Sequence, residues 1–138
     1  MNDVVYIALG SNVGDREVTL ARARAAIAGI PDTRILGETA IEETEPIGPI
    51  PQGRYLNQMI VVETELAPAV LLAALQRIER AAGRVRSMRW GPRTLDLDIV
   101  LIEGKEITEK ALTVPHPELP NRDFWQRELH ELKGVHHG

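Results

Sequence analysis

Residues 89–102 read RWGPRTLDLDIVLI and join a loop to the start of a strand. From Asp96 onward polar and apolar residues alternate and then become wholly apolar, which predicts a strand that enters a hydrophobic core. Side chains two positions apart on a strand share a face, so the carboxylates of Asp96 and Asp98 are expected to point the same way. Just upstream, Gly91-Pro92 interrupts regular structure and predicts a loop.

The side chains of this stretch favour a metal ion bound together with a polyphosphate. Two carboxylates on one strand face, with no lysine beside them, suit a hard cation such as Mg²⁺. Arg89 and Arg93 lie in the adjoining loop, and guanidinium groups bind phosphate oxygens through forked pairs of donors. An Asp-x-Asp pair is common in proteins, so a plain loop followed by a strand remains the alternative.

The composition is that of one domain without signals for membranes or nucleic acids. A chain of 138 residues can form a single core, so we expect one domain over residues 1–138. The net charge of −4 argues against general nucleic-acid binding. There is no cysteine, and the apolar run at 4–9 is too short for a signal peptide or a membrane span. We therefore expect a cytoplasmic protein that binds neither nucleic acid nor membrane. A monomer is a separate expectation, which the composition does not address.

The pattern of apolar residues also predicts the order of the secondary-structure elements. The expected elements are a strand at 4–9, a helix from about 15 to 29, strands at 33–44 and 55–66, a helix at 68–82, the strand beginning at 96, a short strand near 107 and a short terminal helix. This order is that of the split βαβ unit of ferredoxin-like folds. The predicted fold class is therefore α+β, with helices packed on a mostly antiparallel sheet.

Several motifs together resemble one enzyme family. The run RWGPRTLDLDI at 89–99 is similar to the signature of the 6-hydroxymethyl-7,8-dihydropterin pyrophosphokinases, enzymes of folate synthesis. An apolar strand followed by Gly-Ser-Asn is usual in that family and occurs here at 9–12. The family's pattern of Thr-x-Pro-x-Gly, Gln and aromatic-x-Asn matches residues 44–57, and Val-Pro-His-Pro with Arg-x-Phe matches residues 114–124. The resemblance covers most of residues 4–124.

The sequence departs from the family's pattern in two places. Glu42 stands where the family commonly has an aromatic residue, which affects the packing under the strand that carries it. From Trp125 onward the family usually continues with apolar residues and a proline, whereas this chain reads WQRELHEL and stops at Gly138. The packing of the last helix therefore does not follow from the resemblance.

The resemblance implies transfer of a pyrophosphoryl group from ATP to 6-hydroxymethyl-7,8-dihydropterin, with AMP as the second product. It implies two Mg²⁺ ions held by Asp96 and Asp98, with ATP as co-substrate. The catalytic residues implied are Arg84, Arg93, Asp96 and Asp98. The ATP site implied comprises Gln76, Glu79, Arg86, Arg93, Ile99, Thr113, His116 and Arg122. The pterin site implied comprises Thr44, Pro46, Ile47, Tyr55, Asn57, Trp90 and Phe124. The loop at 84–95 is long and rich in arginine, and we hypothesise that it closes as a lid.

Other interpretations of these residues remain open on sequence alone. Solvent exposure is the ordinary expectation for Gln76 and Glu79, and Asn57 by itself is more typical of a hydrogen-bonding residue at a strand end. A nucleotidyltransferase also pairs Gly-Ser with Asp-x-Asp, but there the two lie close in sequence. A ferredoxin-like RNA-binding module is opposed by the acidic charge and the scarcity of strand aromatics. A relative that binds nucleotide without turnover is a further alternative.

Overall fold

The computed structural model describes residues 2–12, 14–45, 53–83 and 95–137. Its elements are β1 (Asp3–Ser11), α1 (Arg16–Ala28), β2 (Thr33–Glu38), β3 (Glu42–Thr44), β4 (Tyr55–Thr64), α2 (Pro68–Ala81), β5 (Asp96–Ile102), β6 (Ile107–Thr108), β7 (Thr113–Val114), the 3₁₀ turn η1 (Leu119–Asn121) and α3 (Asp123–His137).

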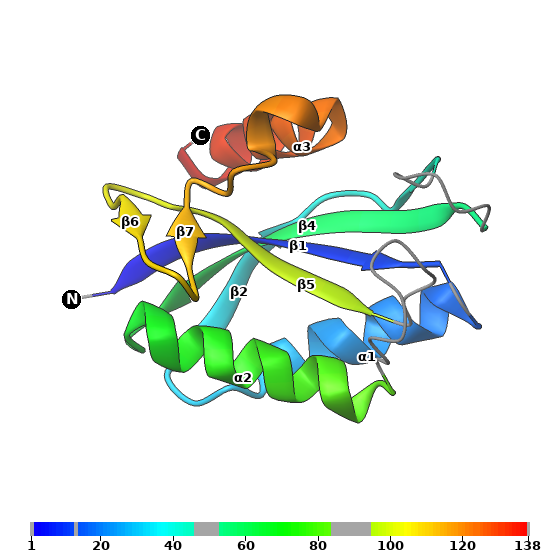
Figure 1. Cartoon of the computed structure of the whole chain (residues 1–138), viewed down its shortest axis with the longest axis horizontal. Helices are drawn as coiled ribbons and strands as arrows, with labels where there is room; N and C mark the ends of the chain where they lie inside the picture. The colour runs from blue at the N-terminus through cyan, green and yellow to red at the C-terminus, as the bar shows by residue number, and fades with distance from the viewer. Residues whose placement is uncertain (1, 13, 46–52, 84–94, 138) are drawn as a thin grey trace.

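One sheet organises these elements. Its strands run in the order β2-β4-β1-β5, β3 pairs with β4, and every pair is antiparallel. Helices α1 and α2 cover one face, and α3 lies across the other (Figure 1). The predicted α+β class with a ferredoxin-like order is confirmed. The strands β6 and β7 form a separate two-stranded ribbon.

Strand β1 lies in the middle of the sheet because its side chains are apolar on both faces. Ile7 and Leu9 belong to the core beneath α1 and α2, and Tyr6 and Ala8 belong to the core beneath α3. A strand covered on both faces needs no polar alternation, which explains the continuous apolar run in the sequence. The hydroxyl of Tyr6 is buried and donates to the Glu103 carboxylate at 2.8 Å.

Local signals in the sequence set the ends of the first two helices. The Asp15 carboxylate accepts a hydrogen bond of 3.1 Å from the Val18 N–H, which caps α1 as predicted. Pro68 occupies the first turn of α2, where its missing N–H costs nothing. Gly83 follows α2 with a φ of +82°, a conformation that favours glycine and ends the helix.

The strand predicted at 33–44 is in fact two strands, β2 and β3. The break lies at Thr39, whose backbone N–H donates to the Met59 carbonyl while its hydroxyl accepts from the Met59 N–H. A side-chain hydroxyl thus replaces a backbone partner, and the ladder shifts register. The pairing of β2 with β4 is also irregular between Ile35 and Gly37. The periodicity alone did not indicate either interruption.

The terminal helix is longer than the short helix predicted. In α3, the apolar residues Trp125, Leu129 and Leu132 are buried against the sheet. Their spacing follows the helical repeat, so one stripe of α3 covers the β1 and β4 side chains that would otherwise face water. In the described part of the chain, no helix is long and apolar enough to cross a membrane.

A carboxylic acid is buried at the junction of α3 and the sheet. The side chain of Glu128 is only 4% exposed, and its Oε2 lies 3.4 Å from the Thr39 hydroxyl. Its other oxygen has no hydrogen-bond partner. Burial, with the nearby charge of Glu42, raises the pKa of Glu128 to about 8, although Thr39 and Arg127 act in the opposite direction and Glu131 adds a smaller repulsion.

The free energy of unfolding should therefore fall as pH rises from about 5 to about 8. The folded pKa of Glu128 lies above its ordinary value, so the stabilisation is complete below the ordinary pKa and is lost as pH rises through about 8. We expect Glu128→Gln to flatten this slope and to be more stable than wild type above about pH 8. Urea denaturation across this range measures the slope, with Glu106→Gln, an exposed carboxylate that does not act on Glu128, as control. An unchanged slope in Glu128→Gln would contradict the assignment.

Candidate active site

The carboxylates of Asp96 and Asp98 lie on one face of β5, as predicted. Both side chains are half-buried, whereas Leu97 and Ile99 between and after them are buried on the opposite face. Across the ladder, Asp96 is paired with Gly10 and Asp98 with Ala8 of β1. Because Ala8 packs in the core under α3, this register places both carboxylates on the α3 side of the sheet.

Gly10 separates the two predicted halves of the site. It is paired with Asp96 on one side and with Asn57 of β4 on the other. A Cβ at this position would lie 3.3 Å from the Asn57 Oδ1, closer than nine in ten real Cβ contacts, and in ordinary contact with the Tyr55 Cδ1 at 3.5 Å. Because Gly10 has no side chain, the sheet surface between the Asp96 carboxylate and the Asn57 amide is open. We call this surface the floor at Gly10.

Three of the predicted pterin residues meet at the adjoining ends of β3 and β4. Thr44 is paired with Tyr55, and the Asn57 amide donates a hydrogen bond to the Thr44 hydroxyl. The side chain of Asn57 is 8% exposed, so its amide is held in a fixed orientation. A fixed amide offers a donor and an acceptor to a planar heterocycle.

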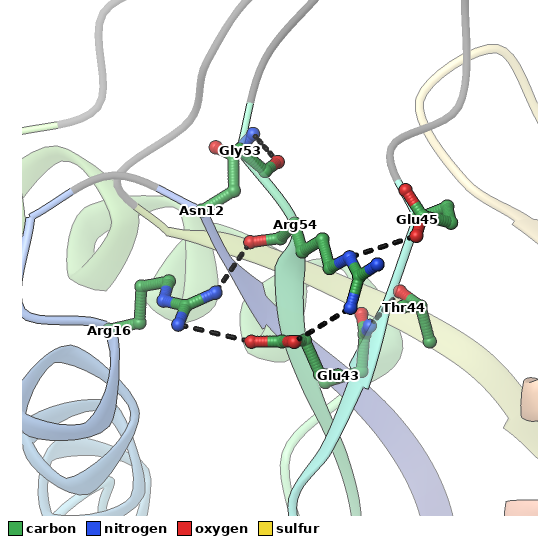
Figure 2. Close-up of polar contacts among 8 residues, drawn as sticks. Asn12, Arg16, Glu43, Thr44, Glu45, Gly53 and Arg54 are labelled. Atoms are coloured by element: carbon green, nitrogen blue, oxygen red, sulfur yellow. Dashed lines mark hydrogen bonds and ion pairs between the residues drawn. The ribbon is translucent and has the colours of Figure 1, made fainter.

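A network of charges ties these strand ends together. Figure 2 shows Arg16 and Arg54 converging on the Glu43 carboxylate, at 3.2 and 3.4 Å. Arg54 also contacts Glu45 at 2.8 Å. Arg16 donates to the Arg54 carbonyl at 2.7 Å, and the Asn12 amide donates to the Gly53 carbonyl at 3.2 Å. The start of α1 is thereby joined to the end of β3 and to the chain that enters β4.

Glu79 of α2 reaches the same strand as the two aspartates from the opposite face of the sheet. Its side chain is 7% exposed, and its Oε2 accepts from the Leu97 N–H at 2.8 Å. Leu97 lies between Asp96 and Asp98, so this bond helps to hold the backbone that carries both. Gln76, one turn earlier, is exposed. The ordinary expectation of exposure holds for Gln76 and is wrong for Glu79.

His116 lies beside the carboxylates. Its backbone N–H donates to the Val100 carbonyl at 2.8 Å, which attaches the segment after β7 to β5. The His116 Nδ1 accepts from the Glu118 N–H at 3.0 Å. The neutral imidazole therefore carries its proton on Nε2, and that nitrogen is 3.7 Å from the Asp98 Oδ1. The predicted nucleotide wall and the predicted metal site are thus adjacent.

Of the remaining predicted residues, Arg122 and Phe124 lie beside Trp125 of α3, whereas Thr113 and Ile99 lie elsewhere. The guanidinium carbon of Arg122 lies 4.3 Å from the centre of the Trp125 ring, and Phe124 is half-buried beside them. Thr113 donates from its hydroxyl to the Glu109 carbonyl at 3.2 Å. The side chain of Ile99 packs in the core under α1 and α2, so only its backbone remains for contact with a ligand.

Part of the predicted site lies outside the described residues. These positions are Pro46, Ile47, Arg84, Arg86, Trp90 and Arg93, together with the loop proposed as a lid. Sequence reasoning did not identify three features of the described site: the floor at Gly10, the charge network of Arg16 and Arg54, and the aromatic ring of Trp125. The strand register could have suggested the first, whereas the other two depend on contacts between distant segments.

A family model described as 7,8-dihydro-6-hydroxymethylpterin-pyrophosphokinase (HPPK) matches residues 6–134. The chain belongs to this family. The predicted resemblance, activity and enzyme class are confirmed: this is an ATP-dependent diphosphokinase of folate biosynthesis that transfers a pyrophosphoryl group to the hydroxymethyl dihydropterin. The family uses ATP and Mg²⁺.

Similar proteins span most of the chain. The 2-amino-4-hydroxy-6-hydroxymethyldihydropteridine pyrophosphokinase of Bacillus subtilis (strain 168) is 42% identical over 132 residues, which are 96% of this chain and 79% of the relative. The enzyme of the same name from Haemophilus influenzae is 44% identical over 127 residues, covering 92% of this chain and 79% of the relative. The folic acid synthesis protein fol1 of Schizosaccharomyces pombe is 38% identical over 93% of this chain but only 18% of its own length.

A solved structure shares the fold. It is described as an HPPK-DHPS in complex with substrates and superimposes with a TM-score of 0.58 at 16% identity. The match covers 80% of this HPPK chain and 29% of the longer solved chain.

Loss of the charge network should weaken pterin binding more than ATP binding. Arg54→Gln removes two ion pairs that hold the strand ends near Thr44 and Tyr55, and exposed pairs are each worth up to about 1 kcal/mol. We expect the KM for the pterin to rise roughly two- to fivefold, with a smaller effect at high salt. Arg34→Gln is the matched control, because it removes the exposed Arg34–Glu63 pair of 3.1 Å at the far end of β4. An equal rise in the KM for the pterin in both variants would contradict a local role of Arg54 at the pterin site.

Removal of the Glu79 carboxylate should destabilise the start of β5. Glu79→Ala leaves the Leu97 N–H without this buried acceptor, which costs about 1–3 kcal/mol of the free energy of unfolding. Glu79→Gln retains an acceptor oxygen and should recover most of this loss. Urea denaturation of both variants measures the difference, and a fully stable Glu79→Ala would show that the bond contributes little.

Proposed function

We propose that the reaction takes place on the α3 side of the sheet, across the floor at Gly10. The observation that carries this proposal is the register that pairs Gly10 with both Asn57 and Asp96. Neighbouring strands are about 5 Å apart, so a pterin bound at Asn57 and a metal ion at Asp96 would lie roughly 10 Å apart. The hydroxymethyl arm of the pterin and the β-phosphate of ATP fit in this interval.

The pterin site comprises Thr44, Tyr55, Asn57 and Phe124, with Pro46, Ile47 and Trp90 as further members. Asn57 reads the edge of the heterocycle, because its amide is oriented by Thr44. Phe124 supplies one aromatic face, with Trp90 proposed for the other. Burial of the amide supports specificity, since a ligand without matching polar groups would leave it unpaired.

The ATP site lies on the other side of the carboxylates. His116 and Arg122 supply N–H donors for phosphate oxygens, with Thr113, Gln76, Arg86 and the backbone of Ile99 as further contacts. Glu79 lies on the opposite face of the sheet, so its part in this site is to hold the Leu97 backbone between the two aspartates. The proton on His116 Nε2 is placed toward Asp98, so this donor could serve a phosphate that shares a metal ion with that carboxylate. Arg84 and Arg93 are assigned to neutralising charge on the transferring and leaving oxygens.

The donor set fits Mg²⁺. Within the described residues no group of three or more histidines and carboxylates could hold a metal ion by itself. Mg²⁺ commonly takes one or two carboxylates and completes its octahedron with phosphate oxygens and water, which matches Asp96 and Asp98. Two bound ions would shield the phosphates and acidify the attacking hydroxyl.

The pterin hydroxyl oxygen forms a bond to the β-phosphorus, and the bond from that phosphorus to the α-phosphate oxygen breaks. AMP leaves with the electron pair, and the hydroxyl proton passes to solvent. The role of the protein's own residues is to align the two reactants and to place positive charge near the oxygens.

We also propose that residues 1–138 form one domain, which acts as a monomer in the cytoplasm. Its partners are small-molecule substrates alone, and neither nucleic acid nor membrane.

The first experiment follows AMP from the protein with ATP, Mg²⁺ and the hydroxymethyl dihydropterin. AMP should form only when the pterin is present, whereas ADP or no nucleotide product would reject the proposal.

Asp96→Asn and Asp98→Asn should each lower turnover by at least about a hundredfold, because charge stabilisation at the phosphates is lost. Glu106→Gln, an exposed carboxylate in the turn after β5, is the control and should retain full activity. Wild-type rates in either aspartate variant would contradict the metal assignment.

A further inference from the structure

Trp125 contacts both side chains that the proposed function assigns to ATP on this wall. Its ring is 2% exposed and packs in the core under α3. The His116 ring meets it edge-on, with centroids 5.0 Å apart and an interplanar angle of 83°. The Arg122 guanidinium carbon lies 4.3 Å from the ring centre. One buried indole thus supports an imidazole and a guanidinium at once.

The contact with Arg122 orients a cation that has few other restraints. No ion pair joins Arg122 to a carboxylate within the described residues, and its Nε is buried without a hydrogen-bond partner. An aromatic face attracts a guanidinium without using its N–H donors. Arg122 is therefore held in place while its terminal N–H groups stay available for phosphate oxygens. A carboxylate partner would instead compete with the phosphates.

The contact with His116 completes an orientation that the backbone begins. Hydrogen bonds already fix the His116 main chain to Val100 and its Nδ1 to Glu118. The edge-on contact with Trp125 further restricts rotation of the imidazole ring. Nε2 is then directed toward Asp98. The Trp125 ring and the two hydrogen bonds thus restrain the His116 side chain together.

We propose that Trp125 is a positioning residue for ATP, acting through Arg122 and His116. The inference rests on the proposed ATP site. A buried residue with a purely structural role would lower stability without selecting one substrate. Trp125 instead links the packing of α3 to the affinity for nucleotide.

The test compares Trp125→Leu and Trp125→Phe in binding a nonhydrolysable ATP analogue and, separately, the pterin. Trp125→Leu should weaken analogue binding about two- to thirtyfold, in line with a lost cation–π contact. Trp125→Phe, which keeps a smaller ring, should lose less. Leu132→Ala is the control, because Leu132 is equally buried in the same core and makes neither aromatic contact. Pterin affinity should change little in any of them.

A double-mutant cycle separates positioning from general destabilisation. If Trp125 acts through Arg122, then Trp125→Leu should weaken analogue binding much less in an Arg122→Ala background than in wild type. Additive losses, or an equal loss in Leu132→Ala, would overturn the proposal. If Arg122→Ala and His116→Ala leave analogue binding unchanged, the proposed ATP site itself is wrong. If they weaken it and Trp125→Leu does not, only the role of Trp125 is wrong.

One measurement on the wild-type protein needs no folded Trp125 variant. Protons of Arg122 above the indole face should be shifted upfield in the NMR spectrum by the ring current. Addition of the ATP analogue should perturb these signals and that of the Trp125 indole N–H together. Ordinary shifts for Arg122 would overturn the proposal.

Discussion

The pairing of β1 on both of its edges is the constraint on which the rest of this structure depends. β1 pairs with β4 from Asp3 to Ser11 and with β5 from Val5 to Gly10. A shift of one residue in either ladder would turn every side chain to the opposite face. The two cores fix the faces, because Ile7 must face α1 and α2 while Tyr6 must face α3. The β1–β5 ladder shifts register once, between Tyr6 and Ile7, and is regular from Ile7 to Gly10. The same register brings Asn57 and Asp96 to either side of Gly10.

The two faces of the sheet have different tasks. The face under α1 and α2 is filled by apolar side chains, and Glu79 is a buried carboxylate there that reaches the backbone of β5. On the other face, α3 covers only the part of the sheet around Tyr6 and Val61. The end of that face with Gly10, Asn57 and Asp96 carries the polar groups. Rigid packing under one end of the strands thus supports chemistry at the other.

The C-terminal helix combines packing with buried polar contacts. Its buried stripe covers the sheet, Glu128 places an acid against Thr39, and Trp125 lies under His116 and Arg122. The family model extends to residue 134, so most of α3 lies within the matched part of the chain, and the expectation that the match ends at Phe124 was wrong. Glu42 is paired with Asn57 and contacts Arg127 of α3 at 3.3 Å. This ion pair joins β3 to α3.

By itself the sequence determined the order of the elements, the cap at Asp15, the shared face of Asp96 and Asp98, and the family. These depend on periodicity and on neighbours within a few residues, which a linear pattern records. Only the tertiary structure decided the break at Thr39, the burial of Glu79 and Glu128, the floor at Gly10 and the contacts of Trp125. Each depends on segments distant in the chain, where packing against another element overrides the ordinary preference of the residue.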